Sequence, residues 1–219
     1  MLAIAGAIGC AFLLLAVWRT QRLWKVYRIS ATSHPPKLQL VCRKLEISLD
    51  QVICSAEPDA IAFCMGWLQP YIVISTGLIE QVSVRELSAI LAHEQWHRQH
   101  RDPLRLLLMQ LLQTVLYPLP MIHELYRAFL TQIEIEADAA AVEYSGRPAL
   151  ASALYKMLTL PTPPASTTYS AVVTSFSPQA NRLAHLLNPQ LSQPIAFSTV
   201  CLVLSLLPFF LLCFTMFIT

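Results

Sequence analysis

The segment at residues 84–100, VRELSAILAHEQWHRQH, constrains this chain more than any other, because it contains an HExxH motif that begins at His93. Ser83 followed three residues later by Glu86 predicts a capping box, in which each side chain accepts a hydrogen bond from the other residue's backbone. A helix should therefore start directly after Ser83. On that helix His93 and His97 lie one turn apart on the same face. This is the spacing that two imidazoles need to bind one zinc ion.

Glu94 follows the first histidine and is rotated away from the line that joins the two imidazoles. In a zinc site this position suits a general base, which takes a proton from water without occupying a coordination site. A rival pair, His97 with His100, would leave His93 and Glu94 without a role and would put no carboxylate beside the water. The remaining alternative is a chance match, with histidines that only lie on a helix surface.

A third zinc ligand is expected from a second helix, because hydrolytic zinc sites use three protein ligands and keep one position open for water. Residues 133–144, IEIEADAAAVEY, predict that helix, which Gly146 closes. Glu134 and Asp138 share one face, whereas Glu136 points elsewhere. Glu134 is the expected ligand, and Asp138 the expected acceptor that orients a ligand histidine. Solvated surface acids are the alternative for an isolated ExxxD pattern.

The combination of HEQWH with Glu134 and Asp138 resembles the zinc site of gluzincin membrane peptidases. Residues 62–66, 70–78 and 101–104 are similar to the BlaR/MecR-type peptidases, and the resemblance covers residues 60–146. The sequence Glu-Ala-Asp at residues 136–138 is more similar to that of the related heat-shock and prenyl-protein membrane peptidases. The resemblance implies a gluzincin-like domain that cleaves peptide bonds with one bound zinc ion.

The composition indicates a membrane protein, since 55% of the residues are hydrophobic, 13% are charged and the mean hydropathy is +0.52. Two stretches, at residues 2–18 and 195–218, contain no charged side chain. They predict transmembrane helices at residues 1–19 and 193–219, with the peptidase domain at residues 20–192 between them. A signal peptide is the alternative for the first stretch, but it lacks a basic start and a clear cleavage site. Basic residues follow it directly, at Arg19, Arg22, Lys25 and Arg28.

This basic cluster places the peptidase domain in the cytoplasm under the positive-inside rule. The expected location is therefore a bacterial inner membrane, with a multi-pass chain in contact with the lipid bilayer. A net charge of +2 with scattered basic residues predicts no nucleic-acid partner. The six cysteines form no CxxC pair and should be reduced in a cytoplasmic domain.

The predicted fold class is mainly α with a small β-sheet (α+β). Residues 33–45 predict a short helix and residues 51–55 a strand, and two further apolar runs, at residues 60–65 and 71–75, predict a hairpin. The second strand of that hairpin lies where the resembled family has an edge strand along the active-site cleft. Substrate backbone would pair with it by strand addition. An ordinary core strand is the alternative. The residues of this expected substrate strand are Tyr71, Ile72, Val73 and Ile74.

Residues 104–122 are almost wholly apolar, yet they should not cross a membrane once, because His97 before them and Glu134 after them must reach the same ion. We expect this segment to lie in the domain core, to re-enter, or to rest at the membrane interface. Its helix should break near Pro118.

The last third of the chain predicts a helix at residues 147–158, a loop at 161–170 and a helix that follows Ser177. The latter contains Arg182, which the resemblance suggests as a support for the catalytic region, although a solvated arginine is the commoner case. The donor that stabilises the oxyanion is not singled out by spacing. Arg182, His100 and Tyr126 are unranked candidates.

The expected function is a membrane-anchored zinc endopeptidase that acts on a protein or peptide substrate. The resemblance suggests a regulatory repressor as substrate, and a separate sensor protein as partner. The chain ends at Thr219 without room for an extracellular sensor domain, so direct β-lactam sensing is not expected. The alternatives are a catalytically silent membrane scaffold or signalling module that retains the zinc site, and a zinc hydrolase with a non-peptide substrate.

Overall fold

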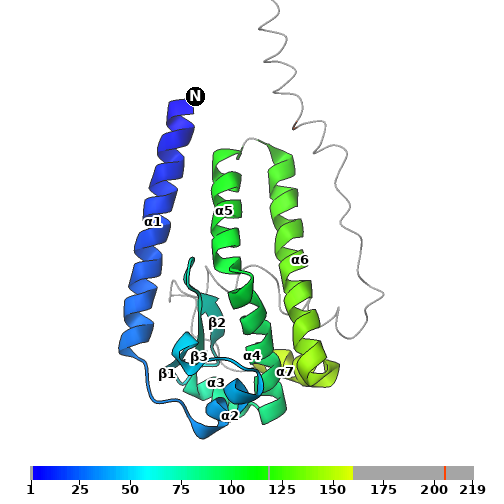
Figure 1. Ribbon diagram of the computed structural model, residues 1–219. Helices are drawn as coiled ribbons and strands as arrows, with labels where there is room; N and C mark the ends of the chain where they lie inside the picture. Colours follow the sequence, from blue (N-terminus) through cyan, green and yellow to red (C-terminus); the bar gives the residue numbers. More distant parts are fainter. Residues whose placement is uncertain (1, 118, 160–204, 206–219) are drawn as a thin grey trace, which may run out of the picture.

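The computed structural model describes residues 2–117, 119–159 and 205. Its elements confirm a mainly helical α+β fold with one small sheet (Figure 1). In chain order these elements are α1 (Leu2–Ile29), α2 (Pro36–Lys44), the 3-10 helix η1 (Leu49–Gln51), β1 (Val52–Ser55), β2 (Ala62–Met65), β3 (Tyr71–Ser75), α3 (Thr76–Gln81), α4 (Val84–Gln99), α5 (Asp102–Val115), α6 (Pro120–Ser145) and α7 (Arg147–Thr159).

The sheet has the order β1-β3-β2, with β3 parallel to β1 and antiparallel to β2. The predicted hairpin is therefore confirmed, but the expectation that its second strand lies at an edge is wrong. β3 is the central strand, because β1 pairs with the side of β3 that β2 leaves open. The edge strand of the hairpin is β2.

The two faces of the sheet pack against different helices, because successive side chains of a strand point to opposite faces. Val73 of β3 joins Phe63 of β2 and, from the second half of α1, Leu23 and Tyr27. Its neighbours Ile72 and Ile74 belong to the main core, which also contains buried residues of α2, α3, α4, α6 and α7. The sheet thus lies between α1 and the helix that carries the HExxH motif.

Helix α4 begins as the sequence predicts. The Ser83 hydroxyl oxygen accepts from the backbone of Glu86 at 3.3 Å, and the Glu86 carboxylate accepts from the backbone of Ser83 at 2.6 Å. From Glu86 to Glu94 every residue of the helix is buried. A helix surrounded on all sides by protein is held rigidly, so the side chains near its second half are fixed in position.

Helices α5 and α6 form a hairpin that leaves the body of the molecule and returns to it (Figure 1). Helix α5 ends at Val115 and α6 begins at Pro120, so the predicted helix break in this region is confirmed. Residues 104–122 are therefore the outgoing arm and the tip of a helical hairpin. The returning arm, α6, brings Glu134 back beside α4. This agrees with the expectation that His97 and Glu134 can reach the same ion.

Helix α1 continues well past the expected boundary at residue 19 and ends at Ile29. Within the described ranges, no helix combines the length and the apolar character that crossing a membrane requires. The expected span at residues 1–19 is therefore not supported. Apart from Ser205, the expected span at residues 193–219 lies outside the described residues. The expected helix that follows Ser177, with its Arg182, lies outside them as well.

Candidate metal centre

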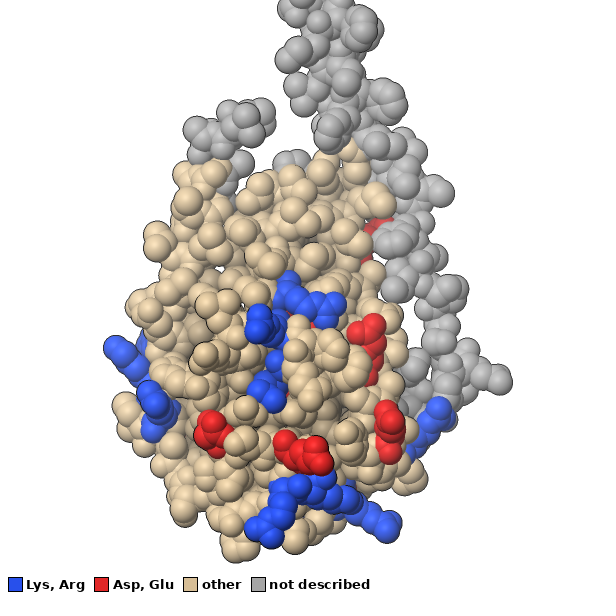
Figure 2. Space-filling view, viewed as in Figure 1, with Lys and Arg blue, Asp and Glu red and all other residues tan. Residues whose placement is uncertain are grey.

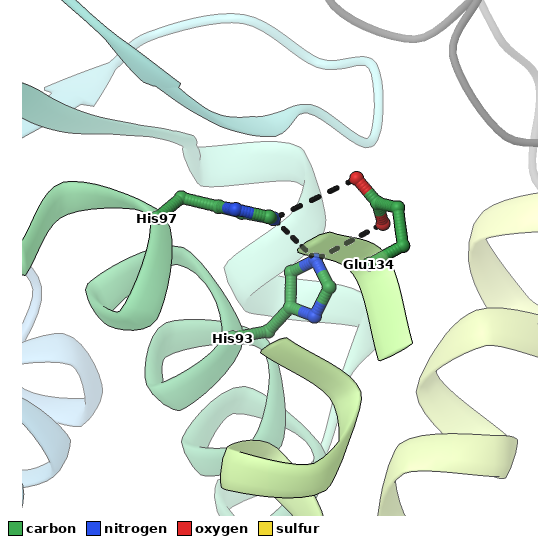
Figure 3. A group of neighbouring side chains, drawn as sticks. All are labelled: His93, His97 and Glu134. Carbon is green, nitrogen blue, oxygen red and sulfur yellow. Dashed lines mark hydrogen bonds and ion pairs between the residues drawn. The ribbon is translucent and has the colours of Figure 1, made fainter. Parts of the chain in front are cut away.

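Three potential ligands converge between α4 and α6 (Figure 3). His93 and His97 come from consecutive turns of α4, and their Nε2 atoms lie 3.0 Å apart. Glu134 of α6 faces both imidazoles, with carboxylate oxygens 3.6 Å from His93 Nε2 and 3.7 Å from His97 Nε2. All three ligand atoms lie within 4.8 Å of one another. The structure thus brings together the three residues that the sequence assigns to the metal.

Each of these histidines is oriented by a buried carboxylate on its other nitrogen. His93 Nδ1 lies 3.0 Å from Asp138 Oδ1, which is where the ExxxD spacing predicts that acceptor. His97 Nδ1 lies 2.8 Å from Asp102 Oδ2. When the Nδ1 hydrogen is donated to a carboxylate, the Nε2 lone pair is left for a metal.

Asp102 is the functional residue that sequence reasoning missed. Its carboxylate is 1% exposed and also accepts from Arg105 Nη1 at 2.6 Å. Arg101, just before it, has the left-handed backbone angle φ 53°, which is uncommon outside glycine. This turn directs α5 away from α4 and lets its first residue reach back to His97. The available signal was an aspartate five positions after the last histidine of the motif.

Electrostatics around His97 favour positive charge at the point of convergence. Burial alone would lower the pKa of His97, but the hydrogen bond to Asp102 and the charges of Glu94 and Glu134 outweigh burial and raise this pKa. Burial would likewise raise the pKa of Asp102, but contacts with His97 and Arg105 lower it. The carboxylate of Asp102 therefore stays charged beside the imidazole of His97.

The donor set fits a divalent cation. Two Nε2 atoms that both have their hydrogen on the opposite nitrogen would face each other as acceptors, which is unfavourable without a cation between them. Zn–N bonds of about 2.0–2.1 Å in a tetrahedral site separate two nitrogens by about 3.3 Å, close to the distance in the structure. Two imidazoles and one carboxylate are a common ligand set of catalytic zinc sites.

Glu94 is buried and lines the same cavity as the ligand cluster, but it is not one of the three converging residues. The cavity has a volume of about 450 Å³. Its walls come from α1, β2, α4, α5, α6 and α7. Cys64 of β2 also lines it, and burial, followed by the charge of Glu94, raises the pKa of this thiol well above its usual value.

Two of the candidates for the oxyanion donor, His100 and Tyr126, lie away from the ligand cluster. His100 is exposed at the end of α4, where it stacks on Trp96 with ring centroids 3.9 Å apart and Nδ1 lies 2.9 Å from the Trp96 carbonyl oxygen. It does not pair with His97 toward a common point. Tyr126 is buried behind Gln110, whose amide donates to the tyrosine hydroxyl at 3.1 Å, and it is Gln110 that lines the cavity. Glu136 accepts from Gln132 on the surface, as expected of a residue outside the site.

The expected substrate strand needs correction as well. None of Tyr71, Ile72, Val73 and Ile74 lines the cavity, since both edges of β3 are hydrogen-bonded to neighbouring strands. All four residues of β2 line it, together with Gly66 and Trp67. The strand beside the candidate metal centre is therefore β2.

Comparison with known proteins agrees with this geometry. Residues 1–186 match the family described as BlaR1 peptidase M56. A protease HtpX homolog from Pyrobaculum calidifontis is 34% identical over 69 residues, which is 32% of this chain and 20% of that protein. Protease HtpX from Nitrosococcus oceani is 33% identical over 75 residues, 33% of this chain and 25% of that protein. The chain thus matches about a fifth to a quarter of the length of these relatives.

Proposed function

Because the chain belongs to the BlaR1 peptidase M56 family, we propose that it is a zinc-dependent endopeptidase attached to a membrane. The observation that carries this proposal is the convergence of His93, His97 and Glu134 at one point of a cavity that Glu94 also lines. A structural zinc site is normally closed by a fourth protein ligand and needs no base. This cluster has three potential ligands and a carboxylate next to them.

In the proposed mechanism His93, His97 and Glu134 hold zinc, which supplies Lewis-acid chemistry by lowering the pKa of a water and polarising the scissile carbonyl. Glu94 takes the proton from the attacking water and passes it to the leaving amine. Asp138 and Asp102 keep the hydrogens of both imidazoles on Nδ1. Burial of Glu94 keeps bulk water from competing for its proton.

We assign the substrate-aligning role to β2. One side of β2 is hydrogen-bonded to β3, and the residues of β2 line the cavity beside the metal cluster. A substrate backbone that adds to the other side of β2 would be oriented by main-chain hydrogen bonds with little demand on sequence. This favours a peptide over a small non-peptide substrate.

Membrane attachment is supported by an apolar end of the molecule. Residues 2–18 of α1 and residues 106–117 at the end of α5 contain no charged side chain. Several large apolar side chains of these segments are exposed, among them Leu14, Trp18, Leu108 and Tyr117. On the face drawn in Figure 2 this end shows no Lys or Arg and one acidic patch at its edge, whereas Lys and Arg lie over the middle of the molecule and around its opposite end. Exposed apolar surface of this extent marks a membrane or protein contact.

We place the charged end, with the catalytic cluster near its boundary, on the cytoplasmic side of a bacterial inner membrane. The substrate we propose is a cytoplasmic or membrane protein, such as a regulatory repressor. A separate sensor protein would then deliver the activating signal.

The test is proteolysis by the detergent-purified chain. We expect zinc-loaded wild type to cleave casein or itself, and Glu94→Gln to retain zinc and lose cleavage by at least about a thousandfold, because the proton acceptor is gone. Glu136→Gln is the matched control on the surface of α6. Near-normal cleavage by Glu94→Gln would refute the mechanism, and zinc without cleavage in wild type would favour the silent scaffold.

A further inference from the structure

One basic residue of α1 faces the catalytic cavity. Arg19 lines it, together with Thr20 and Leu23 of the same helix. The other two arginines of the basic cluster lie against aromatic rings. The guanidinium of Arg22 lies 5.5 Å from the ring centre of Trp18, and that of Arg28 lies 5.3 Å from the ring centre of Trp24. Among the described residues, Arg19 has no ion pair and no hydrogen bond from its side chain.

The cavity that Arg19 lines has both apolar and acidic lining residues. Leu15 and Leu23 of α1 and Met65 of β2 line the same cavity. The acidic lining residues lie with the metal cluster, and two of the three, Asp102 and Glu134, already contact its histidines. Histidines apart, Arg19 is the cationic side chain among the described residues that line this cavity. A ligand along β2 would thus have the metal cluster at one point and a guanidinium at another.

We propose that Arg19 binds a carboxylate of the substrate and makes the enzyme prefer acidic peptides. This inference rests on the proposed peptidase function, which places the substrate in this cavity. A guanidinium binds a carboxylate through two parallel hydrogen bonds. The carboxylate is either a Glu or Asp side chain of the substrate or its free C-terminus.

Arg19 is exposed, so it lies where the cavity meets solvent. Partial exposure weakens a charge pair through solvent screening. The expected preference for the charged ligand is therefore about threefold to tenfold in affinity, and it should shrink as salt is added.

The test measures peptide binding without turnover. Fluorescent alanine-leucine octapeptides are titrated into the full chain carrying Glu94→Gln, in detergent and with zinc. Each peptide has either Glu or Gln at one scanned position, and either a free or an amidated C-terminus. The same titrations are run with Arg19→Gln, Arg19→Lys and, as matched control, Arg22→Gln added.

We expect the chain with Arg19 to bind a charged peptide more tightly than its neutral partner, and Arg19→Gln to remove that preference. Arg19→Lys should restore part of it, and Arg22→Gln should leave it unchanged. Loss of the preference for Glu over Gln identifies a side-chain carboxylate, and loss of the preference for free acid over amide identifies the C-terminus.

The proposal would be overturned by a preference for the charged peptide that is unchanged in Arg19→Gln, or that is lost equally in Arg22→Gln. It would also be overturned if no peptide bound. An Arg19→Gln chain that keeps the preference but binds vesicles of anionic lipid less well would overturn it too, and would assign Arg19 to the lipid surface. Casein cleavage by wild type is scored separately. An Arg19-dependent preference without cleavage would keep the carboxylate site and reject the peptidase function.

Discussion

Helix α4 carries two clusters built around buried carboxylates, one at each end, and they differ in what surrounds the carboxylate. At the start of the helix Glu86 accepts from the backbone of Ser83, from the Ser152 hydroxyl and from Lys156 Nζ, the last at 2.8 Å. These partners tie α4 to α7. Burial alone would raise the pKa of Glu86, but these hydrogen bonds outweigh it and lower this pKa to about 2.

At the other end of α4, the carboxylates of Asp138 and Asp102 orient two imidazoles, and those imidazoles converge with Glu134 on one point. The first cluster is completed by the chain's own donors, so its interactions stabilise the fold. The second directs three potential ligand atoms toward a common position, as the proposed zinc site requires. Mutations in the two clusters should therefore separate stability from metal binding.

The largest expected effect is at a ligand histidine. His97→Ala should lose bound zinc and reduce cleavage at least about a thousandfold, because two remaining ligands hold zinc poorly. Zinc content by mass spectrometry and casein cleavage measure both. His100→Ala is the matched control, since His100 is exposed and stacks on Trp96. Equal zinc loss in both variants would restore the rival pair of His97 with His100.

A smaller effect is expected at the orienting carboxylates. Asp138→Asn and Asp102→Asn should each weaken zinc binding by about tenfold to a hundredfold, because the imidazoles lose a charged acceptor. The effect of Asp102→Asn should be the larger, since it also leaves Arg105 without its ion pair. Competition with a chelator measures the affinity. Asp50→Asn, at an exposed aspartate that accepts from the Ser48 hydroxyl, is a surface control, and an equal change there would contradict the assignment.

How far the sequence predicts this site depends on how local each contact is. The capping box and the placement of His93 and His97 one turn apart follow from helix geometry, and the structure confirms both. The contact of His97 with Asp102 depends on a left-handed turn at Arg101, a conformation that the sequence does not announce.

Strand order was predicted less well, for a different physical reason. Alternating apolar residues predict a strand and its hairpin partner. They do not predict which other strand of the chain pairs with the second edge of that strand. β1 is hydrogen-bonded to the free side of β3, which makes β3 the central strand. The edge strand of the hairpin, and the one that lines the cavity, is therefore β2. Glu134, by contrast, was found because the helical spacing of Glu134 and Asp138 complements that of the two histidines.

The smallest expected effect is at the other cluster, where a change should leave zinc binding intact. Glu86→Gln keeps an oxygen for the backbone of Ser83 but loses the charge that faces Lys156. The free energy of unfolding should fall by about 2 kcal/mol at neutral pH, with unchanged zinc affinity. Chemical denaturation of both chains in detergent measures the difference. A loss of zinc as large as in Asp102→Asn would erase the distinction between the clusters.

The pH dependence of that difference sharpens the same comparison. Because the folded pKa of Glu86 is about 2, below the ordinary value of 4.5, its charge stabilises the fold fully above pH 4.5. This contribution is lost as the pH falls from 4.5 toward 2. The stability difference between wild type and Glu86→Gln should therefore shrink over this range, and a difference that grows on acidification would contradict the assignment.

The most direct test of the metal centre compares two glutamates of α6 that lie two positions apart. Glu134 faces both histidines, whereas Glu136 bonds to Gln132 on the surface. Zinc per chain should be measured by mass spectrometry on wild type, Glu134→Gln and Glu136→Gln. We predict one zinc per chain in wild type and in Glu136→Gln, and strongly reduced zinc in Glu134→Gln. No zinc in wild type, or full zinc in Glu134→Gln, would contradict the proposed ligand set.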